Sequence, residues 1–216
     1  MMLKDKVAVI YGAGGAIGSA VARAFAPEGA NLFLTGRRLA PVEVVAEEVA
    51  AAGGSVEAAE VDALDEQAVD KHLRSVIDKA GRVDVSFNAI GIPNPKTRAP
   101  LVELDVEQFS LPIATYTRSC FLTARLAARR MVPNESGVIM TVTALHSRTG
   151  LSSVGGYGPS QAVKEALTRD LSAELAPQGI RGSDRPRRSR QRDRSRCPEA
   201  HDRVIARGLP RRRARA

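Results

Sequence analysis

The sequence predicts a three-layer α/β domain with a doubly wound parallel sheet, and three observations carry this prediction. Short apolar runs alternate with longer segments whose apolar residues recur at helical spacing. The first apolar run is almost continuous, as expected of a strand that is buried on both faces. A glycine-rich segment separates this run from the first helical segment. This alternation is typical of βαβ units, whose helices cover both faces of a parallel sheet.

The expected elements follow one another in five units. The first strand ends in glycines, and the second helix opens with a proline that suits a first helical turn. Gly53 and Gly54 then end that helix. The expected strands are residues 6–11, 31–35, 56–61, 83–88 and 138–142, and the expected helices are residues 16–26, 41–52, 65–80, 106–132 and 157–176.

A sixth strand is expected to begin at residues 179–181, but the composition changes abruptly at Gly182. From Gly182 onward the chain has thirteen arginines, no lysine and four acidic residues, whereas residues 1–181 have 19 basic and 20 acidic side chains. The formal charge of +8 therefore belongs to the last 35 residues. We expect a domain over residues 1–181 whose sheet is C-terminally incomplete, and an Arg-rich, disordered tail over residues 182–216.

The tail allows two further interpretations. Arginine without lysine, mixed with Ala, Pro, Gly and Ser, is the composition that a GC-rich gene gives in a shifted frame, so we hypothesise a frameshift product. An Arg-rich segment can also bind nucleic acid by releasing counterions. The tail has no aromatic residue to stack on bases, and residues 1–181 show no basic patch, so nucleic acid is not favoured as a partner.

Composition excludes several other classes of protein. Cys120 and Cys197 lie far apart with no CxxC or Cys/His cluster, so neither a disulfide framework nor a metal site is expected. No apolar run approaches the roughly 20 residues that span a bilayer, and the N-terminus shows no signal-peptide pattern. We expect a cytoplasmic protein with no membrane partner.

The segment YGAGGAIG, residues 11–18, is the first candidate binding site. Glycines allow a tight turn and a close backbone approach, so that a pyrophosphate can accept hydrogen bonds from amides at a helix N-terminus. The motif departs from GxGxxG because Ile17 occupies the last glycine position, and as a bare motif it is equally a structural turn. Its place at the first strand–helix junction favours a Rossmann-type nucleotide loop. The candidate cofactor-binding residues of this loop are Gly12, Gly14, Gly15, Ile17 and Gly18.

The end of the second expected strand indicates which dinucleotide would bind. Dinucleotide folds that use NAD place an acidic residue here to bind the ribose 2′-hydroxyl, but this chain has Gly36, Arg37 and Arg38. A guanidinium in place of a carboxylate favours the 2′-phosphate of NADP over NAD. The alternative is that both arginines are solvated loop residues.

With these residues in view, residues 4–181 resemble the short-chain dehydrogenase/reductase family, which implies a strand order of 3-2-1-4-5. The family's TGxxxGIG motif corresponds to residues 11–18, with Tyr11 in place of Thr and Ala16 in place of the middle Gly. Asp62 corresponds to the family's adenine-contacting Asp. Asn88 opens the segment that corresponds to the family's NNAG motif. Residues 162–181 are similar to the family's last long helix and its sixth strand.

The resemblance also implies the chemistry, which in this family uses an Asn-Ser-Tyr-Lys tetrad. The Tyr is the general acid/base, the Lys lowers the Tyr pKa and holds the nicotinamide ribose, the Ser polarises the carbonyl, and the Asn supports a water relay. Tyr157 stands at the position of the catalytic Tyr. The other three positions are altered to Tyr116 for Asn, Ala144 for Ser and Gln161 for Lys.

Nearby polar residues are candidates to replace the lost groups. Gln161 can bond a ribose hydroxyl but carries no charge. Lys164 lies seven residues after Tyr157, on the same helix face, and we expect an exposed helix residue; the alternative is that it partly replaces the missing cation. Thr143 would reach the site only if its loop shifted. His146 and Ser147 lie just beyond; a loop His and Ser by default face solvent, and the alternative is that both lie within the cleft.

Two functions follow from the residues together with the resemblance. The first is an oxidoreductase that transfers hydride between NADP(H) and a small carbonyl or alcohol substrate, with Tyr157 as the catalytic residue. The second is a dinucleotide-binding protein of the same fold with little or no turnover. The resemblance also implies that the helices at residues 106–132 and 157–176 form a dimer interface, so a homo-oligomer is expected.

Overall fold

The computed structural model describes residues 1–92, 99–150 and 152–182. The expectations for the tail after Gly182 lie outside the described residues. They include its disorder, its frameshift origin, its binding to nucleic acid and the environment of Cys197.

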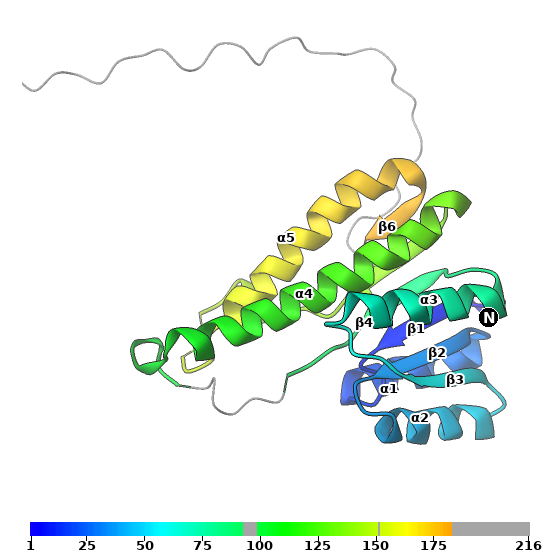
Figure 1. Cartoon of the computed structure of the whole chain (residues 1–216), viewed down its shortest axis with the longest axis horizontal. Coiled ribbons are helices and arrows are strands. Elements are labelled where there is room, and N and C mark those ends of the chain that lie inside the picture. Colours follow the sequence, from blue (N-terminus) through cyan, green and yellow to red (C-terminus); the bar gives the residue numbers. More distant parts are fainter. Residues whose placement is uncertain (93–98, 151, 183–216) are drawn as a thin grey trace, which may run out of the picture. The chain divides into compact units, whose positions relative to one another are not determined.

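A parallel sheet forms the centre of the domain (Figure 1). In the described residues it has six strands in the order β3-β2-β1-β4-β5-β6, and all neighbouring pairs are parallel. The strands are β1 (Val7–Tyr11), β2 (Asn31–Gly36), β3 (Ser55–Glu60), β4 (Val85–Asn88), β5 (Gly137–Thr141) and β6 (Ile180–Gly182). The first five stand in the order that the resemblance implies.

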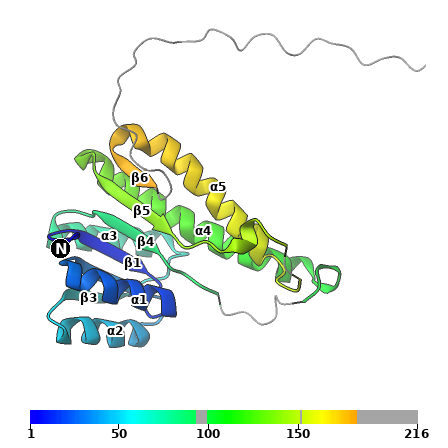
Figure 2. The ribbon, with the colours of Figure 1, turned by 180° about the vertical axis from the view of Figure 1, so that it is seen from behind.

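Helices cover both faces of the sheet, which confirms the three-layer, doubly wound Rossmann-type fold (Figures 1 and 2). Apolar side chains of α3, α4 and α5 share one core with the sheet, and those of α1 and α2 share the other. The helices are α1 (Ala16–Phe25), α2 (Ala40–Ala51), α3 (Glu66–Ala80), α4 (Val106–Met131) and α5 (Tyr157–Leu175). Short 3-10 turns in the described chain are η1 (Ala26–Glu28), η3 (Leu101–Glu103), η4 (Val132–Asn134), η5 (Leu145–Ser147) and η6 (Ala176–Gln178).

Strand β1 shows why a nearly continuous apolar run predicts a central strand. Successive side chains of a strand point to opposite faces. Val9 and Tyr11 therefore enter the core under α3 and α4, whereas Ala8 and Ile10 enter the core under α1 and α2. All four side chains are completely buried.

The sixth strand is more complete than the sequence predicts. Residues 180–182 pair in parallel register with β5, with Ile180 opposite Gly137 and Gly182 opposite Ile139. Ile180 is fully buried. Gly179 has a left-handed φ of 76°, and a Cβ there would lie 1.9 Å from the Glu135 carbonyl oxygen, so the turn into β6 requires glycine.

Strand β4 begins at Val85, two residues later than predicted, and Asp84 directly before it serves as an anchor beside β1. Asp84 is 4% exposed. Its carboxylate accepts hydrogen bonds from the Val7 backbone N–H at 3.0 Å and from Arg82 Nε at 2.9 Å, and Lys6 Nζ lies 3.6 Å away. The carboxylate therefore joins the start of β1 to the start of β4.

We expect Asp84→Ala to lower the free energy of unfolding by about 2 kcal/mol, because the buried Val7 N–H loses a charged acceptor. Arg82 and Lys6 are partly exposed and regain hydration, so the loss stays below that of a fully buried ion pair. Urea denaturation measures it. Asp78→Ala, which removes an exposed carboxylate on α3, is the control and should change stability by less than about 0.5 kcal/mol. Equal losses in the two variants would contradict the anchor role.

Candidate functional site

The candidate residues lie at one edge of the sheet. In a parallel sheet the carboxyl ends of all strands meet at the same edge, and ligands of doubly wound folds bind outside that edge. The residues that follow or end the strands here are Gly12 to Gly15 after β1, Arg37 after β2, Asp62 after β3, Asn88 in β4, and Ala144 to Ser147 after β5, with Tyr157 opening α5.

The glycine loop between β1 and α1 is packed too tightly for side chains. Gly12 has a φ of 77°, and a Cβ there would lie 2.9 Å from the Ala89 carbonyl oxygen. A Cβ on Gly18 would lie 2.3 Å from the Gly12 carbonyl oxygen, and one on Gly14 would lie 2.8 Å from Pro41 Cβ. Glycine is therefore needed at Gly12 for the approach to the residue after β4, at Gly14 for the approach to α2, and at Gly18 for the approach of α1 to the loop itself.

The N-terminus of α1 is available to an anion. Gly15 is its N-cap, no side chain among the described residues caps it, and the first turn has no acidic residue. Gly14, Gly15 and Ala16 are exposed, and Ile17 is 51% exposed. Uncapped amides and the helix dipole favour a negatively charged group here. The donor set fits the pyrophosphate of a dinucleotide.

Arg37 and Asp62 stand at the ends of the next two strands. Arg37 and Arg38 are exposed in the bend after β2, and neither forms an ion pair with any described residue. The Asp62 carboxylate accepts a hydrogen bond from the Leu64 N–H at 2.9 Å, which fixes the turn after β3. Both residues follow carboxyl ends of strands, at the edge where ligands of doubly wound folds bind.

Asn88 is buried, and its amide is used within the protein. Its Nδ2 donates to Thr123 Oγ1 of α4 at 3.0 Å, and its Oδ1 accepts from the Ile90 N–H at 3.1 Å. The side chain therefore ties the loop after β4 to α4. Its predicted part in cofactor binding stays a prediction, and the contacts indicate that it would act by holding this loop.

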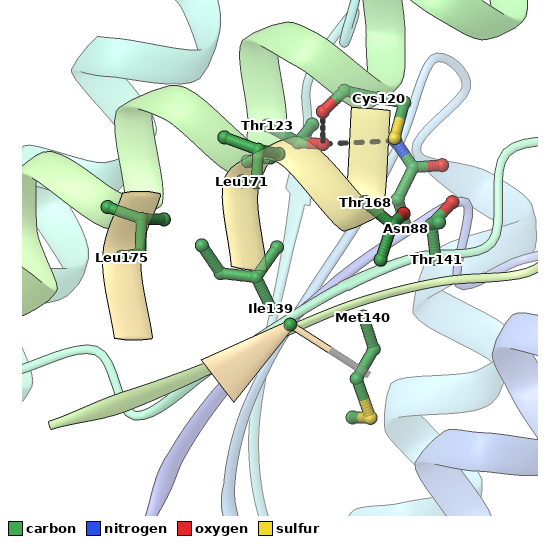
Figure 3. A pocket seen from close by; sticks show the side chains of 11 residues that line it. Asn88, Cys120, Thr123, Ile139, Met140, Thr141, Thr168, Leu171 and Leu175 are labelled. Atoms are coloured by element: carbon green, nitrogen blue, oxygen red, sulfur yellow. Dashed lines mark hydrogen bonds between the residues drawn. The ribbon is translucent and has the colours of Figure 1, made fainter. Parts of the chain in front are cut away.

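Asn88 also lines a small pocket between the sheet and helices α4 and α5 (Figure 3). Cys120, Thr123 and Thr141 lie near Asn88 at one end, and the lining continues through the apolar side chains of Ile139, Leu171 and Leu175. Burial raises the pKa of the Cys120 thiol, so it is held as a neutral group. Tyr157 does not line this pocket, which is therefore distinct from the candidate catalytic site.

Tyr157 is the first residue of α5 and is packed between two aromatic rings. The Tyr116 ring of α4 lies 5.8 Å away between centroids at 68°, and the His146 ring of η5 lies 5.4 Å away at 68°. Both are edge-to-face contacts, which are favourable for aromatic pairs. The expectation that His146 faces solvent is wrong because its ring packs on Tyr157.

Gly156 brings this end of α5 close to α4. It is buried, and a Cβ there would lie 2.0 Å from the Phe109 carbonyl oxygen and 3.0 Å from Pro112 Cγ. Only a residue without a side chain allows this approach. Sequence reasoning missed this role, although the Gly155–Gly156 pair directly before Tyr157 was a visible signal.

The α5 residues after Tyr157 turn a polar face inward. Gln161 is 1% exposed, and its Nε2 donates to Ser160 Oγ at 3.1 Å. The expectation of an exposed Lys164 is wrong, because this residue is 4% exposed. Its ammonium donates a hydrogen bond to the Val142 carbonyl and lies 4.8 Å from the centroid of the Tyr116 ring. Burial lowers the pKa of Lys164 to about 8.

The loop after β5 is fixed to α5. Ser147 Oγ donates to Glu165 Oε1 at 2.5 Å, and Arg148 Nε donates to Glu165 Oε2 at 3.2 Å. These contacts, first from Ser147 and then from Arg148, hold the pKa of Glu165 below its usual value. Ser147 is therefore not the free, solvent-facing residue that was expected. Its bond places the segment from Ala144 to His146 beside Tyr157.

A family model described as enoyl-(acyl carrier protein) reductase matches residues 12–182. The chain belongs to the short-chain dehydrogenase/reductase family. Among curated relatives, 7alpha-hydroxysteroid dehydrogenase of Escherichia coli (strain K12) is 29% identical over 188 residues, which cover 84% of this chain and 69% of that enzyme. 2,3-Dihydro-2,3-dihydroxybenzoate dehydrogenase of Bacillus subtilis (strain 168) is 28% identical over 179 residues, which cover 83% of this chain and 67% of that enzyme.

Solved structures of this family share the fold. A metagenomic short-chain oxidoreductase in complex with NADP is 27% identical with a TM-score of 0.77, over 84% of this chain and 81% of that one. An NAD+-bound xylitol dehydrogenase is 26% identical with a TM-score of 0.80, and the match covers 84% of this chain and 69% of that one. A short-chain dehydrogenase/reductase from Mycobacterium marinum is 31% identical with a TM-score of 0.78, over 83% and 73%.

Two further observations concern the described residues of this short-chain dehydrogenase/reductase. Within residues 1–92, 99–150 and 152–182, no three His, Cys, Asp or Glu side chains gather as metal ligands would. Along the same residues, no helix is both long and apolar enough to cross a membrane.

Proposed function

We propose that this short-chain dehydrogenase/reductase is an NADP(H)-dependent oxidoreductase that transfers hydride between the dinucleotide and a small carbonyl or alcohol substrate. One observation carries the proposal: Tyr157 and the uncapped N-terminus of α1 both follow carboxyl ends of strands in the same sheet. An acid/base phenol and a pyrophosphate site at one edge are the parts that this chemistry needs.

The dinucleotide would be held by the loop and by Arg37. The free amides of α1 bind the pyrophosphate, and the exposed Arg37 guanidinium binds the 2′-phosphate. The solved relatives include one with NADP and one with NAD+, so the choice of NADP rests on Arg37 alone. The buried Gln161 and the loop that Asn88 holds would border the nicotinamide end.

Tyr157 would move the proton. In reduction its phenol donates a proton to the substrate oxygen, and in oxidation its phenolate takes the proton back. When bound, the dinucleotide supplies or accepts the hydride. A phenol has an unperturbed pKa of about 10, so a nearby positive charge would make this exchange easier near neutral pH.

A second function is favoured by a specific observation. Ala144 and Gln161 stand where the family's Ser and Lys belong, so neither the carbonyl-polarising hydroxyl nor the cation at that position is present. A dinucleotide-binding protein with little or no turnover would tolerate both changes.

One sequence of measurements separates the two functions. NADPH fluorescence would be titrated with the protein, and NADPH oxidation would then be followed with a panel of ketones and aldehydes. Saturable binding with turnover supports the oxidoreductase, and saturable binding without turnover on any substrate supports the second function. Absence of saturable binding would contradict both.

We expect Arg37→Ala to weaken NADPH binding by about 10- to 100-fold, because one charge-assisted contact to the 2′-phosphate is lost. NADH binding should stay within about twofold, since NADH has no such phosphate. Fluorescence titrations with both cofactors measure this change in preference. Arg74→Ala removes an exposed arginine of α3 and controls for the lost charge. An unchanged NADPH affinity in Arg37→Ala would contradict the choice of NADP.

The long helices α4 and α5 lie side by side and would carry a homo-oligomer interface (Figure 1). Phe121 of α4 and Val163 of α5 leave large apolar side chains exposed. A cytoplasmic location belongs to the same proposal. Sedimentation at several protein concentrations would show a single monomeric species if the interface does not exist.

A further inference from the structure

We propose that Lys164 supplies the positive charge that stabilises the phenolate of Tyr157, and that Tyr116 holds this charge in place. The inference rests on the proposed function, in which Tyr157 moves the proton. Lys164 is thus a positioning residue that acts on Tyr157 from one helical turn beyond Gln161.

The helix places Lys164 on the correct face. Residues at i, i+4 and i+7 of a helix share one side, so Tyr157, Gln161 and Lys164 lie along one stripe of α5. Ser160, Gln161 and Lys164 are the buried residues of α5. Long helical side chains lean toward the helix N-terminus, which brings the Lys164 ammonium back toward Tyr157.

Two contacts fix the ammonium at the carboxyl edge of the sheet. It donates a hydrogen bond to the Val142 carbonyl, just beyond β5, and it lies 4.8 Å from the Tyr116 ring centroid. A cation over the face of an aromatic ring is attracted by the ring's quadrupole. The Tyr116 hydroxyl accepts a hydrogen bond from the Ile92 N–H at 3.0 Å, which anchors the ring.

Tyr116 also sets the separation between the charge and Tyr157. The Tyr116 ring centroid lies 5.8 Å from the Tyr157 ring centroid and 4.8 Å from the Lys164 ammonium. The sum of these two distances is therefore the upper limit for the separation between the ammonium and the Tyr157 ring centroid. Lys164 and Tyr116 are buried and Tyr157 is half-buried, so a charge at such a separation is only partly screened and still acts on the Tyr157 phenol. Tyr116 occupies the position of the family's tetrad Asn, so this altered residue becomes the support for the relocated charge.

The burial of Lys164 needs an explanation other than packing. Among the described residues no carboxylate forms an ion pair with it. The titratable groups in contact with it are Cys120 and Tyr116 from α4, and the segment after β5 offers only a carbonyl. Tyr157 is reached beyond the Tyr116 ring. An apolar side chain of similar length would fill the same space without the cost of burying an ammonium.

The side chain of Lys164 carries its positive charge only over a limited pH range. Burial lowers the pKa of Lys164 to about 8. The ammonium is therefore charged below pH 8 and is progressively lost above it, so its support of the Tyr157 phenolate should fade as the pH rises through 8. An arginine at this position would stay charged throughout.

The ionisation of Tyr157 can be measured without substrate or cofactor. The chain has three tyrosines and no tryptophan, so tyrosinate absorbance during a pH titration reports few groups. Burial raises the pKa of Tyr11 far above its usual value, which separates it from the others. The variants are Lys164→Arg, Lys164→Met and the exposed-lysine control Lys71→Met, each also made with Tyr157→Phe or Tyr116→Phe to assign the signal.

We expect the Tyr157 midpoint in Lys164→Arg to lie about one pH unit below that in Lys164→Met, with Lys71→Met like the wild type. The wild type should form more tyrosinate than Lys164→Met just above pH 8, where Tyr157 begins to ionise while part of Lys164 is still charged. That comparison alone decides the question if Lys164→Arg does not fold. Equal Tyr157 ionisation in all variants, or a response that persists in Tyr157→Phe and vanishes in Tyr116→Phe, would overturn the inference.

Activity gives a second readout that separates this inference from the proposed function. If the wild type reduces a carbonyl, Lys164→Met should lower kcat by about tenfold below pH 8 and Lys164→Arg should extend the active range above pH 8. Turnover with a pH profile that no Lys164 variant changes would refute the role of Lys164 and leave the oxidoreductase intact. If NADPH binds without turnover, the oxidoreductase fails, and the tyrosinate titration still decides whether Lys164 acts on Tyr157.

Discussion

Tyr157→Phe is expected to lower kcat by about 10²- to 10⁴-fold, because the variant loses the group that exchanges a proton with the substrate oxygen. The ring remains, so its edge-to-face contacts with Tyr116 and His146 should persist. Steady-state oxidation of NADPH with an accepted carbonyl substrate measures the loss. NADPH affinity should change little, since the phosphate-binding loop and Arg37 are untouched.

The comparison of kcat with cofactor affinity makes this prediction specific. A parallel loss of NADPH binding would point to a misplaced α5 and not to missing acid/base chemistry. Turnover that survives in Tyr157→Phe would contradict Tyr157 as the acid/base. His146, whose ring contacts Tyr157, would then be the next residue to substitute.

Gly156→Ala is expected to lower the free energy of unfolding by about 3 kcal/mol, since the new methyl group collides with backbone atoms of α4. The relevant atom is the Phe109 carbonyl oxygen, 2.0 Å from the position of the added Cβ. Because α4 and α5 must separate to accept it, Tyr157 shifts and kcat should fall by about 10²-fold. Urea denaturation and NADPH oxidation measure the two effects.

Gly150→Ala is the matched control in the same loop. A Cβ at Gly150 would meet no described atom within 4 Å. Its stability should stay within about 0.5 kcal/mol of the wild type, and its kcat should be unchanged. A Gly156→Ala protein as stable and as active as Gly150→Ala would show that the α4–α5 approach is not required at this point.

The fold could be predicted from the sequence because its strands and helices repeat simple patterns. The apolar run at residues 6–11 and the glycines after it predicted a central strand that ends in a tight loop, and the structure has them at β1 and residues 12–15. The phosphate-binding role of this loop stays a prediction. Most predicted boundaries lie within one residue of the observed ones, and the start of β4 differs by two. The anchoring bond from the Val7 N–H to the Asp84 carboxylate could not be predicted, because it joins residues 77 positions apart in the sequence.

The surroundings of Tyr157 could be predicted only in part. Its place at the start of α5 followed from spacing, but the side chains that touch it come from α4 and η5, which are distant in sequence. Lys164 was expected to be exposed because polar helix residues are usually solvated. In the structure, however, the polar residues Ser160, Gln161 and Lys164 form the buried face of α5. A polar stripe is normally solvated, and only the position of β5 and of the Tyr116 ring shows otherwise.

The hydrogen bonds of Asn88 connect helix α4 to the glycine loop after β1. Thr123 of α4 accepts a hydrogen bond from the Asn88 amide, Asn88 accepts one from the Ile90 N–H, and the neighbouring Ala89 carbonyl lies against Gly12 of the glycine loop. In the proposed homo-oligomer, helix α4 would also contact the second copy. If the glycine loop binds the dinucleotide as proposed, a subunit that docks on α4 would stiffen this loop through two side chains, and assembly and dinucleotide affinity should rise and fall together.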